Sequence, residues 1–377
     1  MIPYQLITTQ AELLTFCQYA HRFPYLALDT EFVRTRTYYA KLGLVQVRVH
    51  DQLVLIDPLA EIDLTPFWQL LKDPQLILVI HAGGEDYEIL MQQMGEMPTA
   101  VVDTQIAAAF AGHGDALGYA ALVQHYTNIE IDKSQSRTDW LQRPLQPVQL
   151  DYAAADVQYL YDIYPQLLAE LSAEKLALVK AETIEQVRRR AESIPPQWLY
   201  LFFGNAWQCN RQQLAVLREL LQWRLQRAQQ SNIPLGFVAK DHIVLELARR
   251  CPSNVLQLRG ITELSPVTIR YSGESLLEAI QRGLACTDLP EPLTRLTDLT
   301  DYKATYKQIQ EQVQQLARDL DISPGLVASR RQINDVIHWE WQVPAVAKAE
   351  LIAPDLYRSW RGAKLKPFIT ELLQRDR

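Results

Sequence analysis

Two carboxylates stand two positions apart at the end of an apolar stretch of this 377-residue chain. Asp29 and Glu31 follow residues 25–28, whose sequence Tyr-Leu-Ala-Leu is typical of a buried strand. Because successive side chains of a strand point to opposite faces, residues two apart share a face, and both acids should project together from the strand end. Such a pair is a natural oxygen ligand set for a hard divalent cation.

Two further acidic segments are candidates for the same site. Helical periodicity around Tyr152 and Asp156 places these two residues one turn apart on one face. Residues 76–80 have the pattern of a buried strand, and the glycine-containing turn 81–84 leads into a helix with Asp86 in its first turn. We therefore expect three separate segments to bring acids to one place.

These segments resemble the three exonuclease motifs of the 3′-to-5′ exonucleases that carry four acidic residues and a tyrosine. The matching stretches are Leu28–Phe32, His81–Asp86 and Tyr152–Asp156. Residues 29–39, 133–145 and 329–334 also resemble the bacterial ribonuclease D family, and the likeness runs along nearly the whole chain. The resemblance implies that the catalytic residues are Asp29, Glu31, Asp86, Tyr152 and Asp156. It also implies that the four acids among them are the metal ligands.

Two divalent cations, Mg²⁺ or Mn²⁺, are the cofactors that the resemblance implies. Hydrolysis of a phosphodiester needs an activated water, neutralised phosphoryl oxygens and a stabilised leaving 3′ oxygen, and two ions about 3.5–4 Å apart supply all three. Asp29 is the candidate to bridge the ions. Because the ordinary pKa of tyrosine is near ~10, Tyr152 is a poor general base at neutral pH, and we expect it to orient the attacking water.

The first half of the chain predicts an α/β fold. Residues 25–29, 44–49 and 53–57 have the pattern of short strands, and helices and strands alternate after them. This order indicates a mixed sheet with flanking helices on both faces. The resemblance implies a ribonuclease H-like exonuclease domain over residues 1–170. Within it, Asp103 is predicted to cap a helix that follows it.

The second half is predicted to be helical and repeated. Residues 171–203 form a helical linker in this reading, with a break at Pro195-Pro196. Residues 204–288 and 289–377 then form two small all-α domains, which resemble the helicase-and-ribonuclease-D C-terminal domain, the second copy being divergent. Six identities at one offset of 89 residues support the repeat: Ile233 and Ile322, Gly236 and Gly325, Val238 and Val327, Ala239 and Ala328, Gly273 and Gly362, Leu276 and Leu365.

The charge of the chain is unevenly distributed. A net charge of −7 for the whole chain would argue against a nucleic-acid partner, but the charge of the two halves differs. Residues 1–170 contain 9 Lys and Arg against 21 Asp and Glu, a net −12, whereas residues 171–377 contain 28 against 23, a net +5. Bound metal ions would reverse the field of clustered carboxylates, so the acidic half remains able to hold a phosphodiester.

Four residues near the motifs are candidates for RNA binding: Arg34, Arg36, Tyr38 and Arg137. An arginine can hold a phosphate and a tyrosine can stack on a base, with surface solvation as the alternative for each. Basic residues of the helical half are further candidates for guiding RNA, or for solvating a surface. They are Arg330, Arg331, Lys348, Arg358, Arg361, Lys364 and Lys366, and Arg218, Arg224 and Arg227 are expected on the polar side of a helix over residues 213–227.

The expected function is that of a 3′-to-5′ exoribonuclease that removes nucleotides from the 3′ end of RNA, especially in the maturation of precursor transfer RNA. The motifs leave open a DNA 3′-5′ exonuclease, because both substrates present the same phosphodiester. A non-catalytic RNA-binding scaffold is a third alternative, which predicts the loss of at least one acid, yet all four acids and the tyrosine are present.

No apolar run approaches the ~20 residues of a membrane span, and the N-terminus lacks the pattern of an export signal. The four cysteines are scattered, unlike those of a zinc site or a disulfide scaffold. We therefore expect a cytoplasmic protein without a membrane partner. Because the chain carries two helical domains of its own, we expect a monomer.

Overall fold

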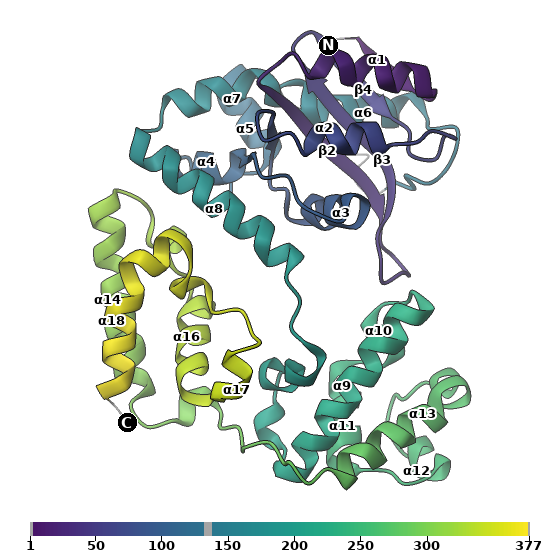
Figure 1. The fold of residues 1–377 in the computed structure, drawn as a ribbon, viewed down its shortest axis with the longest axis vertical. Coiled ribbons are helices and arrows are strands. Elements are labelled where there is room, and N and C mark those ends of the chain that lie inside the picture. The colour runs from purple at the N-terminus through teal and green to yellow at the C-terminus, as the bar shows by residue number, and fades with distance from the viewer. Residues whose placement is uncertain (1–2, 132–137, 376–377) are drawn as a thin grey trace.

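One mixed sheet organises the N-terminal half of the structure, a computed structural model that describes residues 3–131 and 138–375 (Figure 1). Its strands are Tyr4–Ile7 (β1), Tyr25–Val33 (β2), Lys41–Val49 (β3), Gln52–Ile56 (β4), Ile77–Ile80 (β5) and Val101–Asp103 (β6). They lie in the order β1-β4-β3-β2-β5-β6, with β3 antiparallel to both of its neighbours and the other pairs parallel. The predicted mixed sheet is confirmed.

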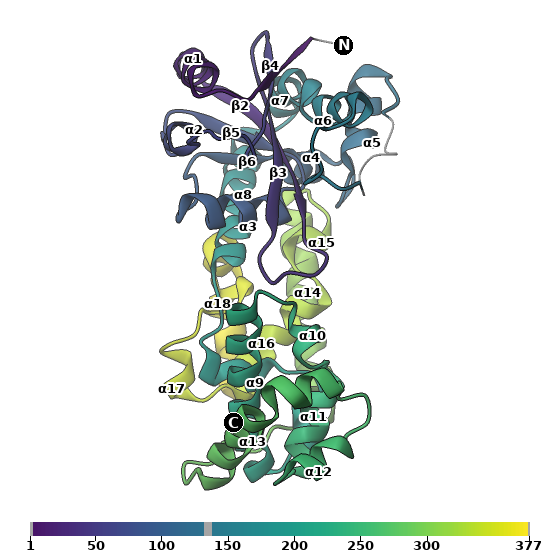
Figure 2. The ribbon, with the colours of Figure 1, turned by 90° about the vertical axis from the view of Figure 1, so that its right-hand side faces the viewer.

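Helices cover both faces of this sheet, as predicted. One face carries α1 (Gln10–Ala20), α2 (Thr65–Leu71) and α3 (Gly84–Met94), and the other carries α4 (Thr104–Ala111), α5 (Tyr119–Thr127), α6 (Pro147–Gln158) and α7 (Leu160–Ala169). Figure 2 shows α1 and α2 on one side of the strands and α5, α6 and α7 on the other. Residues of β2 alternate between the two cores, since Leu26 and Leu28 pack on the α3 side and Ala27 packs on the α6 side.

The strand that carries Asp29 and Glu31 is longer than predicted. β2 continues to Val33, so the two acids lie inside the strand and not at its end. The apolar run stops at Leu28, but the backbone pairs with β3 as far as Val33, with a register shift after Glu31. Strand β5 accompanies β2 only as far as Ala27. The acids therefore lie where β2 has lost one neighbouring strand, which leaves that edge open to α3.

A long helix connects the sheet domain to the helical half. Helix α8 (Ala173–Ala191) is capped by Ser172 and packs against α3, α4 and β6 (Figure 1). It is followed by two short 3₁₀ helices, Pro196–Phe202 (η1) and Ala206–Gln208 (η2). The first helical module comprises α9 (Arg211–Ser231), α10 (Leu235–Val238), α11 (Asp241–Arg250), α12 (Val255–Arg259) and α13 (Pro266–Ala285). The second comprises η3 (Leu296–Asp298), α14 (Tyr302–Leu320), α15 (Pro324–Val327), α16 (Arg330–Gln342), α17 (Ala345–Lys348), η4 (Asp355–Tyr357) and α18 (Ser359–Arg375).

The 89-residue repeat of the sequence is visible in the backbone. Helices α9 and α14 end at Asn232 and Asp321, which are equivalent positions, and both residues adopt a left-handed conformation, with φ of 47° and 50°. Each is followed by a four-residue helix. Asn232 contacts the sheet domain, where the Tyr39 amide donates to its Oδ1 at 3.0 Å, and Asp321 contacts the connecting helix α8, where Lys175 Nζ donates to its Oδ2 at 3.1 Å. The equivalent corner of each module thus faces the N-terminal part of the chain.

Buried ion pairs fasten the second module to α8. The Glu182 carboxylate accepts from the Arg361 guanidinium and, at 3.0 Å, from the Trp360 indole N–H. Arg358 pairs with Glu185 and, at 2.8 Å, with Glu192. The suggestion that Arg358 and Arg361 guide RNA is therefore wrong, because their side chains are paired at this junction and only 14% and 5% exposed. Arg224 likewise lies buried, 2.6 Å from Asp241 Oδ1, and not on the predicted polar surface.

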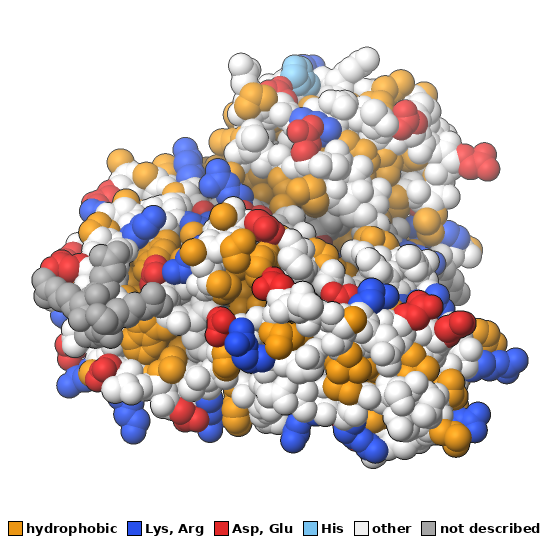
Figure 3. All heavy atoms as spheres, turned by 60° about the horizontal axis from the view of Figure 1, so that its bottom comes forward, with side chains coloured by type: hydrophobic (Ala, Val, Ile, Leu, Met, Phe, Trp, Pro, Cys, Tyr) orange, Lys and Arg blue, Asp and Glu red, His pale blue; other side chains and the backbone are white. Residues whose placement is uncertain are grey.

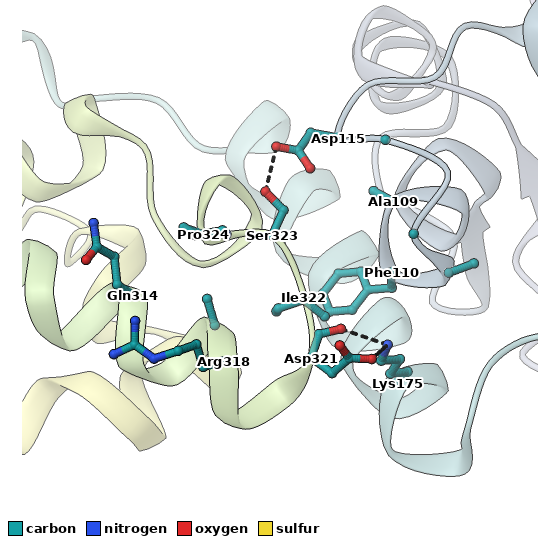
Figure 4. Close-up of a pocket in the computed structure, with 14 residues that line it drawn as sticks. Ala109, Phe110, Asp115, Lys175, Gln314, Arg318, Asp321, Ile322, Ser323 and Pro324 are labelled. Carbon is teal, nitrogen blue, oxygen red and sulfur yellow. Dashed lines mark hydrogen bonds and ion pairs between the residues drawn. The ribbon is translucent and has the colours of Figure 1, made fainter.

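A cavity of about 820 Å³ lies beside the same junction (Figure 4). It is lined by the end of α4, by Lys175 of α8 and by α14 and α15, and the Ser323 hydroxyl donates to Asp115 at 2.9 Å across it. None of the four acidic residues of the exonuclease motifs lines this cavity. It is a gap between domains, separate from the acidic residues. Among the described residues, no helix has the length and apolar character required to cross a membrane.

Candidate metal centre

Three carboxylates converge between β2 and α6. Asp29, Glu31 and Asp156 each offer an oxygen, and these oxygens all lie within 4.8 Å of one another. Asp29 and Glu31 lie two and four positions after Ala27 on β2, so they point to the same side of the sheet as Ala27, the α6 side. Three oxygen donors in such proximity suit a hard divalent cation, which favours carboxylate ligands over nitrogen or sulfur.

The fourth acid of the motifs reaches the site from the opposite side of the sheet. Asp86 lies in the first turn of α3, as predicted, and is buried. Its carboxylate accepts a hydrogen bond from the hydroxyl of Thr30, which lies on β2 between the two acids. The three-acid group found among the described residues does not include Asp86. Its charge still acts on Asp29, since it contributes to raising the pKa of that carboxyl.

A single buried carboxylate shapes the turn that precedes Asp86. Asp103 Oδ1 accepts from the amides of Ala82 and Gln105, both at 2.9 Å, while Oδ2 accepts from the Gly83 amide at 3.1 Å and from the Tyr87 hydroxyl at 3.2 Å. The predicted cap of α4 is confirmed, and the same side chain also holds the start of α3. Ala82 has a φ of 57°, a left-handed conformation that a non-glycine residue adopts only when its surroundings enforce it.

The acids raise one another's pKa values in the absence of a cation. Burial and the charges of Asp86, Asp156 and Glu31 raise the pKa of Asp29 well above its ordinary value. Burial, and then the charges of Asp156 and Asp86, raise the pKa of Glu31 to about 9. Burial raises the pKa of Asp86 to about 6, although the Thr30 hydrogen bond acts in the opposite direction. Cations would relieve this repulsion, so the donor set and its electrostatics fit a divalent metal site.

Helix α6 presents Tyr152 beside the acids. It begins with Pro147 at its first position and buries Ala153 and Ala154 fully, so the helix packs closely on the sheet. Tyr152 and Asp156 lie one turn apart, and the tyrosine ring centroid is 6.1 Å from that of Trp140. Burial, and then the charge of Asp156, raises the pKa of the Tyr152 phenol far above its ordinary value. The side chain is therefore a neutral phenol at physiological pH.

Both ring nitrogens of His81 have hydrogen-bond partners. Its Nδ1 lies 2.9 Å from the Thr104 hydroxyl and its Nε2 lies 3.0 Å from the Leu117 carbonyl. Burial lowers its pKa, which keeps the ring neutral.

The candidates for RNA binding are placed differently by the structure. The Arg34 guanidinium pairs with Glu88 of α3, and Arg36 is exposed. Tyr38 is half-buried, with its ring centroid 4.9 Å from that of Tyr39 in an edge-on contact. Arg137 lies outside the described residues. On the face seen in Figure 3, Lys and Arg side chains are spread among neutral and apolar groups and do not form one large patch.

Sequence reasoning missed Arg190, which lies at the end of α8 and contacts α3. Its Nη1 is 2.9 Å from Glu88 Oε1. The available signal was the run Arg188-Arg189-Arg190 at the end of a predicted helix, but nothing local indicates which of the three contacts α3. Thr30 was also missed as a partner of Asp86, because the two residues are 56 positions apart.

Models of known families match three parts of the chain. Residues 4–172 match a model described as 3′-5′ exonuclease, residues 213–280 match the HRDC domain, and residues 300–367 match the C-terminal HRDC domain of ribonuclease D. The second helical module therefore resembles a distinct, ribonuclease D-specific form of this domain.

Whole-length relatives were also found. The chain is 38% identical to ribonuclease D of Escherichia coli (strain K12), covering 98% of both chains, and 40% identical to ribonuclease D of Cronobacter turicensis, covering 98% of this chain and 100% of the relative. It superposes on the crystal structure of Escherichia coli RNase D, described as an exoribonuclease involved in structured RNA processing, with a TM-score of 0.91 at 38% identity over 99% of both chains. The catalytic core of RRP6 from Trypanosoma brucei shares the fold at 21% identity, with a TM-score of 0.59 over 75% of this chain and 80% of that core.

Proposed function

This chain belongs to the ribonuclease D family, and from that premise we propose that it trims structured RNA from the 3′ end, notably in the maturation of precursor transfer RNA. The observation that carries the proposal is the convergence of Asp29, Glu31 and Asp156, whose oxygens lie within 4.8 Å of one another beside the half-buried Tyr152. Both helical modules match domain models of this family, so the whole chain is consistent with it.

Asp29, Glu31, Asp86 and Asp156 would hold two divalent cations, Mg²⁺ or Mn²⁺. When bound, such cations activate the attacking water and neutralise charge on the phosphoryl and leaving oxygens. Asp86 would approach from α3, held in place by Thr30. The oxygen-only donor set and the mutual repulsion of the acids support this assignment.

Tyr152 orients the attacking water and does not remove its proton. Because burial holds its pKa far above the ordinary value, the phenol keeps its O–H and acts as a hydrogen-bond donor or acceptor. Its position one turn before Asp156 places the hydroxyl on the side of α6 that faces the acids.

The test is a trimming assay on a structured RNA with a short 3′ tail, labelled at its 5′ end and incubated with Mg²⁺ or Mn²⁺. We expect a ladder that shortens one nucleotide at a time in the wild-type protein and is lost in Asp156→Ala. A DNA of the same sequence runs in parallel. Equal trimming of the DNA would favour a DNA exonuclease, and no metal-dependent cleavage of either would favour a scaffold that only binds RNA.

We propose further that the protein acts in the cytoplasm as a monomer. The two helical modules lie in one chain with the sheet domain. At equivalent positions, Asn232 of the first module bonds to the sheet domain and Asp321 of the second bonds to the connecting helix α8. No second copy is needed to bring a helical module to the catalytic half. Size-exclusion chromatography with light scattering tests this, and a stable dimer would contradict it.

A further inference from the structure

Two arginines from distant parts of the chain share one glutamate of α3, the helix that carries Asp86. The guanidinium of Arg34 and that of Arg190 both bond to the Glu88 carboxylate, the second at 2.9 Å. The three side chains are partly exposed, at 31% for Arg34, 46% for Arg190 and 30% for Glu88. A single carboxylate cannot neutralise two guanidinium groups, so this trio carries a net positive charge at the surface.

The trio lies against the elements that hold the catalytic acids. Arg34 follows Glu31 by three residues, directly after the end of β2. Glu88 lies on α3, two positions after Asp86. The Arg190 guanidinium covers Gly84, two positions before Asp86, where a β-carbon would come within 2.9 Å of Nη2. Both arginines therefore approach the same turn of α3 as the buried acid.

The helix α8 explains why only one of its three consecutive arginines is available here. Successive residues of a helix point about 100° apart, so a run of three spreads over most of its circumference. Arg189 points to the second module and pairs with Glu182 at 3.2 Å and with Asp355. Arg188 is 61% exposed and lies 3.9 Å from Glu185. Arg190 alone of the three contacts α3.

We propose that Arg34 and Arg190 bind a phosphate of the RNA backbone next to the 3′-terminal nucleotide, with Glu88 bridging the two guanidinium groups. This inference rests on the proposed exoribonuclease function. Guanidinium groups bind phosphate oxygens through charge-assisted, often bidentate hydrogen bonds, and such contacts position a nucleic acid without reading its sequence. The catalytic acids supply no positive charge of their own, so a pair of arginines beside them provides an anchor for the strand that enters the metal site.

The pair is tested by Arg190→Gln, with Arg188→Gln as the matched control two positions away on the same helix. We expect Arg190→Gln to raise KM for a single-stranded 3′ tail about tenfold and to leave kcat within about twofold. Affinity is also measured by fluorescence anisotropy at several salt concentrations, in the background of Asp156→Asn, so that no cleavage occurs. The slope of log affinity against log salt should fall by about 0.7 in Arg190→Gln, the value for one phosphate contact on a single strand. Arg188→Gln should change neither quantity.

The contacted phosphate is identified with RNAs that carry one neutral methylphosphonate linkage at the first, second or third position from the 3′ end. Neutralising the contacted linkage should weaken binding of the parent protein about tenfold and have no further effect in Arg190→Gln. The inference is overturned if Arg190→Gln binds and trims like Arg188→Gln. It is equally overturned if Arg190→Gln lowers the melting temperature and kcat while KM and the salt slope stay unchanged, because Arg190 would then only fasten α8 to α3. Absence of trimming by the wild-type protein would count against the proposed function, whereas the binding titrations, which need no cleavage, would still decide the arginine pair.

Discussion

The hydroxyl of Thr30 donates a hydrogen bond to the buried carboxylate of Asp86 across the strand β2. Thr30 points to the α3 side of the sheet, whereas its neighbours Asp29 and Glu31 point to the α6 side. The tripeptide Asp29-Thr30-Glu31 thus has side chains on both faces of the sheet. Its two acids lie close to Asp156, and its central hydroxyl bonds to Asp86. Strand β2 therefore contacts an acidic residue from each of the two helices that flank it, Asp156 of α6 and Asp86 of α3.

Replacing Thr30 by Val removes this hydrogen bond and keeps the shape of the side chain. We expect kcat to fall by about ten- to a hundredfold with little change in KM, because Asp86 loses its orientation and not its charge. Thr30→Ser keeps the hydroxyl and serves as the control. Steady-state trimming kinetics on one RNA decide the matter, and equal kcat values for the Val and Ser variants would contradict a positioning role for the hydroxyl.

Asp103→Asn distinguishes the two roles of this carboxylate, which caps α4 and also holds the turn that precedes Asp86. The amide nitrogen of Asn cannot accept the bonds that Oδ2 receives from Gly83 and Tyr87, whereas the remaining oxygen can still cap α4. We expect the free energy of unfolding to fall by about 1–3 kcal/mol, the cost of unsatisfied buried groups. Urea denaturation measures it. Tyr87→Phe removes only one of the two bonds and should cost less than Asp103→Asn.

Asp29→Asn should abolish trimming and stabilise the metal-free protein. Burial and three neighbouring acids raise the pKa of Asp29, so a neutral side chain there relieves unfavourable electrostatics. We expect trimming to be lost and the metal-free protein to gain about 1–2 kcal/mol of stability. Thermal unfolding with EDTA and with Mg²⁺ tests both effects. Mg²⁺ should raise the melting temperature of the wild type and not that of the variant, and a rise of equal size in both would argue against Asp29 as a ligand.

Tyr152→Phe should lower kcat without changing the shape of the pH–rate profile. The pKa of the Tyr152 phenol is raised by burial, so the group remains protonated as the pH rises through the neutral and mildly alkaline range. Deprotonation of the tyrosine therefore contributes no limb to the profile of the wild type. Rates measured from pH 6 to about pH 10 check this. A limb present in the wild type and absent in Tyr152→Phe would show that the phenol ionises during turnover.

Because Glu182 and Arg361 form a buried ion pair, we expect the single variant Arg361→Met to lose more stability than the double variant that also carries Glu182→Gln. Arg361→Met leaves Glu182 with the Trp360 indole and Arg189 as partners, and we expect a loss of about 3–5 kcal/mol because a buried charge is left poorly compensated. Adding Glu182→Gln should restore most of that loss. Chemical denaturation followed by tryptophan fluorescence measures both. A double variant as unstable as Arg361→Met would mean that the pair contributes packing and not charge compensation.

Local sequence determined several parts of this protein. Alternation along β2 predicted that Asp29 and Glu31 share a face, and the spacing of Tyr152 and Asp156 predicted one helical turn between them. The cap at Asp103 and the first-turn position of Asp86 follow from residue types next to them, and the structure confirms both. The second helical module was predicted from identities at a fixed offset. These features depend on neighbours within a few residues or on a repeated pattern, which a single sequence contains.

Contacts between distant segments were decided only by the tertiary structure. The length of β2 depends on its pairing with β3. This pairing continues to Val33, beyond the apolar run that predicted the strand and that ends at Leu28. The partner of Asp86, Thr30, lies on β2, 56 positions away in the sequence. The basic residue Arg361 is buried because Glu182 lies opposite it on α8. Arg190 joins Arg34 because α8 packs along α3. A side chain's exposure, its ion-pair partner and its distance from the acidic residues of the motifs are properties of packed elements, and no short-range pattern in the chain encodes them.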